Sequence, residues 1–286
     1  MNSNLIRRDE FVAYLRQHEK SPGTIEKYLR DVGFYEAWLL ENNIKKPFAN
    51  ASKAKTIALD YKDHLRAEQL VPTTINSKLA AINAYFRFLD INEKVRYLKV
   101  QRRIFLDENR ELTMNEYKTL VKTARAMGNE RIALCMETMA STGMRVSELQ
   151  YVTVEALRNS TIQVDLKAKI RTIFVPQRLA LKLMVFAANS GIESGYVFRT
   201  GSGMPVRRKQ IWNEMKAVSR KAGILESKVF PHNMRHVFAR TYYTQCKDIA
   251  RLADVLGHSS LETTRVYLMD SGLECQRQIN SLGLVC

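Results

Sequence analysis

The sequence predicts a mainly helical protein with one small β-sheet, divided into two domains. Apolar residues follow helical spacing through much of residues 1–100. Residues 101–110 are charged and lack a clear period, which indicates a linker. Residues 161–176 are rich in β-branched and other apolar residues, which predicts a hairpin or small sheet. We therefore expect a helical domain over residues 1–100, a linker over 101–110 and a mixed α/β domain over 111–286.

The N-terminal domain is predicted to be a helical bundle without catalytic groups. Ser21 followed by Pro22 marks a helix start, because serine caps a helix and proline suits its first turn. Further helices are expected at about residues 53–69 and 73–89. The second carries an apolar stripe made by Ile75, Leu79, Ile82, Phe86 and Leu89.

The C-terminal domain is predicted to begin with a capped helix. Thr113 and Glu116 have the spacing of a capping box. Another helix is expected over residues 131–141, ending at Gly143, and others over residues 178–190 and 207–222. The predicted hairpin at residues 161–176 interrupts this helical series and has residues 167–169 near its turn.

Composition indicates a basic protein that works in a reducing compartment. The 286 residues carry a net charge of +16, and both halves are basic: +6 over residues 1–107 and +10 over 108–286. Such a charge suits contact with a polyanion through both domains. The four cysteines lack paired spacing, so we expect free thiols. Without a signal peptide or an apolar run of about 20 residues, we expect a cytoplasmic protein that does not contact membranes.

The stretch from His232 to Tyr267 holds the most informative residues. His232 and Arg235 are three residues apart, so on a helix they share a face. A second helix is expected over residues 247–256, stopping at Gly257. A third is expected to open at Ser259, with Glu262 completing a capping box. His258 would then lie in a tight corner between two helices, where its side chain can be aimed.

These motifs resemble those of the tyrosine recombinase (phage integrase) family. The resemblance rests on H-x-x-R, on L-G-H, on the tyrosine nine residues later, and on STGMRVSEL at residues 141–149. It implies an all-helical core-binding domain that clamps duplex DNA, followed by a catalytic domain. It also implies the catalytic set Arg145, Lys167, His232, Arg235, His258 and the nucleophile Tyr267, with Glu148 holding active-site groups in place.

The catalytic lysine of the family lies on a β-turn like the one expected here. We assign Lys167, with Lys169 as its rival, because this sequence lacks the glycine that usually follows the first lysine of the motif. The alternative for either lysine is that it is a solvated turn residue without a catalytic role. This alternative must be true of at least one of the two.

The residue types suit metal-free cleavage of a phosphodiester. Arginine forks bind the non-bridging oxygens. Tyrosine has an ordinary pKa of about 10, so Tyr267 needs a base, for which His232 is the candidate. Lys167 would protonate the 5′ oxygen, and His258 would donate a hydrogen bond to the phosphate. The resemblance implies a 3′-phosphotyrosyl intermediate that is rejoined without ATP. Neither a cofactor nor a metal is expected.

The resemblance further implies double-stranded DNA with specific recombination sites as partner, bound by a homotetramer on two sites. Residues 270–286 would form a tail exchanged between subunits. Recombination for a mobile element or a phage is the expected setting, and no extra N-terminal domain is expected. The candidate DNA contacts are Arg102, Arg103, Arg207, Arg208 and Lys209.

Three alternative functions compete with this interpretation. His232, His236 and His258 could bind zinc, but Asn233 stands where H-E-x-x-H has its glutamate, and Arg235 would place positive charge beside the metal. A non-catalytic DNA-binding regulator or excision partner explains the charge but not the complete array. A type IB topoisomerase uses related chemistry without a specific site.

Overall fold

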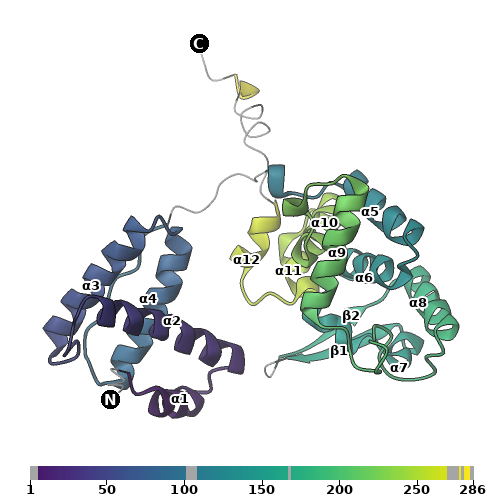
Figure 1. The fold of residues 1–286 in the computed structure, drawn as a ribbon. Helices are drawn as coiled ribbons and strands as arrows, with labels where there is room; N and C mark the ends of the chain where they lie inside the picture. Colours follow the sequence, from purple (N-terminus) through teal and green to yellow (C-terminus); the bar gives the residue numbers. More distant parts are fainter. Residues whose placement is uncertain (1–5, 101–107, 167–168, 269–276, 278–279, 284–286) are drawn as a thin grey trace. The chain divides into compact units, whose positions relative to one another are not determined.

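The computed structural model describes residues 6–100, 108–166, 169–268, 277 and 280–283. The chain divides into two compact units, residues 1–102 and 103–286, here named the N-terminal and the C-terminal unit. Helices dominate both, and the described residues include one two-stranded sheet, in the C-terminal unit (Figure 1). The predicted fold class, mainly α with a small β-sheet, is confirmed.

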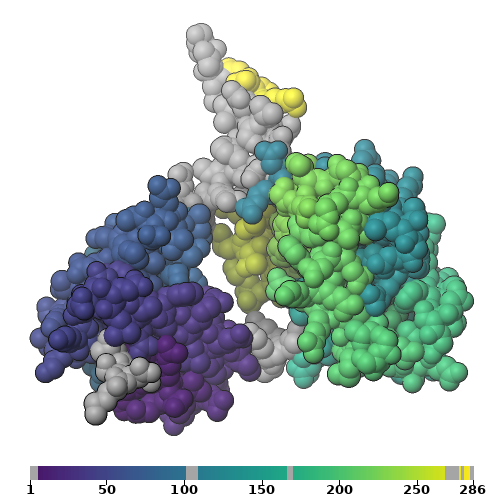
Figure 2. Space-filling model, viewed as in Figure 1, coloured from purple at the N-terminus to yellow at the C-terminus, as the bar shows by residue number. Residues whose placement is uncertain are grey.

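The N-terminal unit is a helical bundle. Its described helices are α1 (Arg8–Gln17), α2 (Pro22–Glu41), α3 (Ala51–Ala67) and α4 (Pro72–Phe88). Ser21 caps α2 by accepting a hydrogen bond from the Thr24 backbone N–H, and Pro22 occupies the first turn as predicted. Four residues of the predicted stripe are buried in α4, namely Ile75, Leu79, Ile82 and Phe86, whereas Leu89 follows the end of the helix and is half-buried. The helices close into one packed body (Figure 2).

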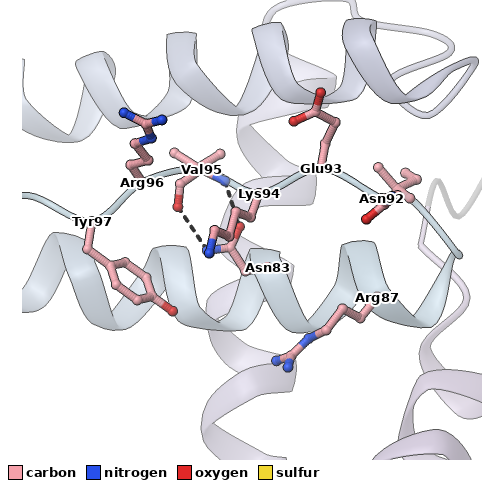
Figure 3. A pocket seen from close by; sticks show the side chains of 9 residues that line it. Asn83, Arg87, Asn92, Glu93, Lys94, Val95, Arg96 and Tyr97 are labelled. Atoms are coloured by element: carbon pink, nitrogen blue, oxygen red, sulfur yellow. Dashed lines mark hydrogen bonds between the residues drawn. The ribbon is translucent and has the colours of Figure 1, made fainter.

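Residues 91–100, which follow α4, form neither a helix nor a strand and are held to that helix by side-chain hydrogen bonds. The Asn83 side chain donates to the Val95 carbonyl at 3.0 Å and accepts from the Val95 N–H at 2.9 Å (Figure 3). Asn76, two helical turns earlier, forms the same pair of bonds with Leu98, at 2.9 and 2.7 Å. The two asparagines thus provide hydrogen-bond partners for the N–H and carbonyl groups of Val95 and Leu98. In a helix or a sheet, other backbone groups would be their partners.

Helix α6 (Glu130–Thr142) forms the centre of the C-terminal unit. It is the most buried helix of that unit among the residues described, and Ala133, Met136 and Met139 have no exposed surface. Packed around the same core are α5 (Met114–Ala126), α7 (Val154–Arg158), α8 (Gln177–Asn189), α9 (Arg208–Ala222) and α10 (Pro231–Cys246). The predicted capping box is present, because Thr113 and Glu116 each accept the other's backbone N–H.

A two-stranded antiparallel hairpin lies at one edge of this unit (Figure 1). Strand β1 (Thr161–Leu166) pairs with β2 (Lys169–Phe174), and Leu166 lies opposite Lys169. The inward face carries Ile162, Val164 and Ile173, which are buried in the core. The predicted hairpin is therefore confirmed, while its connecting residues 167–168 lie outside the described residues.

The last helices are shorter than expected. Helix α11 (Ile249–Leu256) starts two residues later than predicted, because Lys247 adopts a left-handed conformation and Asp248 caps the helix. Helix α12 (Leu261–Arg265) is capped by Ser260 and not by Ser259, which corrects the predicted capping box. Four 3₁₀ turns complete the described elements: η1 (Glu108–Arg110), η2 (Val146–Tyr151), η3 (Glu226–Lys228) and η4 (Val266–Leu268).

Two composition-based expectations meet the structure only in part. Cys135 is buried and Cys246 is exposed, and both are free thiols, while Cys275 and Cys286 lie outside the described residues. Within the ranges described, none of the helices combines the length and the apolar character needed to cross a bilayer.

Candidate active site

The start of α10 brings His232 and Arg235 to the same side of the C-terminal unit. Phe230 is extended and Pro231 begins the helix, where its missing N–H removes nothing from the helical hydrogen bonds. His232 lies in the first turn, and Arg235 follows one turn later. Both line one cavity of about 640 Å³. The two residues therefore share a helix face, as predicted, and that face lines the cavity.

The end of α11 aims His258. Gly257 has φ +65°, a conformation that glycine adopts without strain. The His258 N–H donates to the Ala253 carbonyl at 2.9 Å, and the Gly257 N–H donates to the Asp254 carbonyl at 3.0 Å. This pair of bonds is a Schellman motif, which closes the helix and fixes the direction of the next residue. The predicted corner between two helices is present, with His258 in it.

Tyr267 lies among three histidines. It belongs to the turn η4, which follows α12, and only 3% of its surface is exposed. Its ring stacks on that of His258 at 5.7 Å and meets the ring of His236 edge-on at 4.5 Å. The hydroxyl is 3.4 Å from Nε2 of His232. The hydroxyl therefore has a nitrogen acceptor within reach.

Arg235 is almost completely buried, and its guanidinium joins three parts of the chain. Nη1 donates to the Gly143 carbonyl at 2.5 Å, and Nη2 donates to the Leu256 carbonyl at 2.7 Å. Nη2 is also 2.8 Å from Nε2 of His258. Burial, and after it the positive charge of Arg145, lowers the pKa of Arg235 to about 10. The side chain stays charged at neutral pH.

Arg145 precedes η2 in an extended conformation and is held by Glu148. Its backbone N–H donates to Glu148 Oε2 at 2.6 Å, and its Nη1 donates to Oε1 at 3.0 Å. Glu148 is 1% exposed, whereas 41% of the Arg145 side chain is exposed. The carboxylate thus holds both the backbone and one guanidinium nitrogen of Arg145, whose partly exposed side chain lines the cavity.

The ring of His258 has a defined tautomer in this arrangement. A guanidinium only donates, so Nε2 of His258 accepts from Arg235. Nδ1 then carries the proton and donates to the Thr264 hydroxyl at 2.8 Å. Burial, and after it the positive charges of the nearby arginines, lowers the pKa of His258 to about 4. Burial and then Arg235 also lower the pKa of His232, so both rings are neutral at neutral pH.

Helix α9 contributes another side of the cavity and lies on an outer face of the unit (Figure 2). Arg208 and Trp212 both line it, together with Arg145. Arg207 and Lys209 are exposed but do not belong to the lining. Trp212 is missing from the sequence-based set. The signal was available, since Trp212 lies one turn after Arg208 and so shares its helix face.

Four other predicted residues lie outside the described residues or at the start of a strand. Arg102, Arg103 and Lys167 lie outside the described residues, and Lys169 begins β2. In the part of the chain that the structure covers, no group of three or more histidine, cysteine or carboxylate side chains could hold a metal.

Arg171 is also absent from the sequence-based set, although it is half-buried and its Nη2 lies 2.8 Å from Glu148 Oε2. Strand alternation would have revealed it, because it places this charged residue on the same face as Ile173 and Val175.

Comparison with known proteins agrees with this geometry. The model of the phage integrase family matches residues 110–272, and the model of the phage integrase N-terminal SAM-like domain matches residues 9–94. The tyrosine recombinase XerA of Pyrococcus furiosus is 30% identical over 266 residues, covering 91% of this chain and 87% of the relative. Tyrosine recombinase XerC of Lactobacillus delbrueckii is 26% identical, covering 91% and 92%.

Solved structures share the fold. XerH site-specific recombinase bound to a palindromic difH substrate aligns with a TM-score of 0.70 at 17% identity, covering 91% of this chain and 79% of the other. The Tn1549 transposon integrase in complex with transposon right end DNA aligns with a TM-score of 0.68 at 15% identity, covering 97% and 99%. The resemblance inferred from the sequence motifs is thus confirmed: this chain belongs to the phage integrase family and is a tyrosine recombinase, an enzyme that cleaves and rejoins DNA.

Proposed function

We propose that this recombinase cleaves duplex DNA at specific sites through Tyr267. The observation that carries the assignment is the 3.4 Å approach of the Tyr267 hydroxyl to Nε2 of His232, beside the cavity lined by Arg145 and Arg235. A neutral imidazole accepts the phenolic proton as the oxygen attacks phosphorus. The two arginines offset the charge that builds up on the non-bridging oxygens.

The strand break conserves atoms and charge in two proton transfers. A phosphorus–oxygen bond forms to Tyr267 while the bond to the 5′ oxygen breaks, which leaves a 3′-phosphotyrosyl link and a 5′ hydroxyl. Lys167, with Lys169 as the rival, supplies the proton for the 5′ oxygen. Religation runs the same steps in reverse, with a 5′ hydroxyl as nucleophile, so it requires no ATP.

His258 is proposed to donate a hydrogen bond to the phosphate, which requires a proton on Nε2. Its present tautomer places that proton on Nδ1, against the Thr264 hydroxyl. A hydroxyl both donates and accepts, so Thr264 is able to support either tautomer. Phosphate binding would draw the Arg235 donors away and favour the proton on Nε2.

The proposed assembly is a homotetramer on two DNA sites, with residues 270–286 exchanged between subunits. The domains are taken as residues 1–100 and 111–286, with the linker between them and Arg102 and Arg103 near the phosphates. Arg207, Arg208 and Lys209 are the proposed contacts on the C-terminal side, supported by their exposure. We further propose that the enzyme is cytoplasmic and that it recombines the DNA of a mobile element or phage. The DNA that flanks the gene tests that setting.

A suicide substrate that traps the cleaved strand tests the function. We expect a covalent protein–DNA band with the unmodified enzyme, in excess chelator, and none with Tyr267→Phe, which should bind DNA normally. A non-catalytic regulator would bind the site and give no band with either protein. Relaxation of a plasmid that lacks the specific site would instead identify a topoisomerase.

A further inference from the structure

Arg171 connects the hairpin to two separate parts of the site. It lies on β2 opposite Val164, and 14% of its side chain is exposed. Nη2 donates to Glu148 Oε2 at 2.8 Å. Nη1 donates to the last carbonyls of α11, at Val255 (3.3 Å) and at Leu256. One side chain thus spans η2, β2 and the helix end that aims His258.

Two of the three acceptors of Arg171, Glu148 Oε2 and the Leu256 carbonyl, are shared with an arginine of the cavity. Glu148 Oε2 also accepts the backbone N–H of Arg145, at 2.6 Å. The Leu256 carbonyl also accepts from Nη2 of Arg235, at 2.7 Å. The carbonyls at a helix C-terminus lack helical donors and attract cations, so α11 favours both arginines there. Arg171 is therefore the link between the supports of the two arginines.

The path of the Arg171 side chain depends on the absence of a side chain at Gly257. A Cβ built at Gly257 would lie 2.7 Å from the Arg171 Cδ, so the glycine leaves room for the arginine as well as turning the chain. Burial lowers the pKa of Arg171, whereas the Glu148 charge raises it. Burying such an ion pair is costly, and replacing both partners of a buried pair by apolar residues of similar volume is often neutral or stabilising in proteins. Its presence points to a role beyond packing.

We propose that Arg171 is a positioning residue. It docks the β1–β2 hairpin onto Glu148 and the Leu256 carbonyl, the groups that hold Arg145 and Arg235 in place. The general acid carried at the turn of that hairpin is thereby held in register with Arg145 and Arg235. Proton donation depends on such register, since a misplacement of about 1 Å costs roughly 100-fold in rate. The inference rests on the proposed function, because it assumes that a hairpin lysine protonates the 5′ oxygen.

The test combines Arg171→Lys with two substrates. One is the ordinary suicide substrate, and the other carries sulfur at the 5′ bridging position, where the leaving group needs little acid. A lysine keeps the charge but does not reach both acceptors. We expect single-turnover cleavage of the oxygen substrate to fall by roughly 100-fold and that of the sulfur substrate by less than about 5-fold. Thr172→Ala, on the exposed face of β2, is the matched control and should leave both rates unchanged.

A double-mutant cycle separates positioning from general damage to the fold. Lys167→Ala and Lys169→Ala identify the acid as the lysine whose loss is rescued by sulfur. Adding Arg171→Lys to that variant should lower the oxygen rate by less than about 3-fold, because the group it positions is gone. Equal losses on both substrates, or additive losses in the cycle, would overturn the proposal.

The remaining outcomes are also decisive. If neither lysine variant is rescued, the acid is not on the hairpin and the proposal fails, while the covalent band still tests Tyr267 independently. Circular dichroism and single-site DNA binding verify that Arg171→Lys is folded. Should it unfold, Arg171→Gln, which keeps a planar donor for Glu148, is to be measured on the same two substrates, with the same selective loss expected.

Discussion

At the scale of single residues, the site depends on how each arginine divides its donors. A guanidinium has five N–H groups. Three of those on Arg235 are engaged by Gly143, Leu256 and His258, so it is a structural as well as a chemical group. Arg145 has a different balance, because Glu148 is the acceptor for one of its guanidinium nitrogens and 41% of its side chain is exposed.

This difference predicts distinct outcomes for two matched substitutions. Arg145→Lys and Arg235→Lys should each slow cleavage by at least about 100-fold, because a point charge does not replace a fork. Arg235→Lys should also lower the free energy of unfolding by about 1–3 kcal/mol for each carbonyl left without a donor. Arg145→Lys should change it by less than about 1 kcal/mol. Single-turnover assays and urea denaturation measure both; near-normal cleavage by both variants would refute the clamp.

The neutral state of His232 predicts the pH dependence of cleavage. Burial and Arg235 lower the pKa of this ring below 6.5. As the proton acceptor it must be neutral, so activity should be lost only as the pH falls through that lowered pKa. We therefore expect the acid limb of the second-order cleavage rate, measured at subsaturating DNA, to have its midpoint below pH 6.5. His232→Gln should be slow and lack this limb. A midpoint above pH 6.5 in the unmodified enzyme would argue against His232 as the base.

At the scale of elements, the end of α6 controls how closely α10 and α11 approach it. Gly143 has φ +66°, and a Cβ built there would lie 2.5 Å from the Phe238 ring and 2.8 Å from a methyl group of Leu256. Its carbonyl also accepts from Arg235. One glycine thus ends α6, admits two neighbours and contributes an acceptor to the site.

Gly143→Ala should consequently be more harmful than a glycine substitution at a comparable turn. Gly191, with φ +63° and open space around its position, is the matched control. Gly191→Ala should cost about 1–2 kcal/mol of unfolding free energy, from the left-handed conformation alone. Gly143→Ala adds the crowding, about 1–3 kcal/mol more, and should slow cleavage as α10 and α11 shift. If urea denaturation gives the same loss of unfolding free energy for Gly143→Ala and Gly191→Ala, the crowding at Gly143 is relieved at no cost.

Most elements and the main site residues were predictable because their signals are local. Caps at Ser21 and Thr113, the glycine stops at Gly143 and Gly257, and the β-rich run at 161–176 each depend on a few neighbouring residues. The course of residues 91–100 was not predictable, because asparagines of α4 hold it. The inward position of Arg171 was predictable from strand alternation, but its partners were not, because they are 23 and 85 residues away.

At the scale of the whole molecule, the proposed exchange of residues 270–286 would couple the active sites of different subunits in the proposed tetramer. Residues 270–286 fall largely outside the described residues, so the proposal rests on the sequence and the family. Removing residues 272–286 should leave single-site DNA binding nearly intact and abolish synapsis of two sites, and recombination with it. Native gels with one and two labelled sites measure this. Recombination by the truncated enzyme would contradict exchange, and failure to fold would indicate docking within one subunit.

The identity of the nucleophile is the central claim of this account. Three tyrosines lie near the end of the chain's catalytic array: Tyr242 and Tyr243 on α10, and Tyr267 in η4. The covalent complex trapped on a suicide substrate can be digested, and the peptide that carries the nucleotide identified by mass spectrometry. We predict that the modified residue is Tyr267. Modification of Tyr242 or Tyr243, or a complex that persists in Tyr267→Phe, would contradict the account.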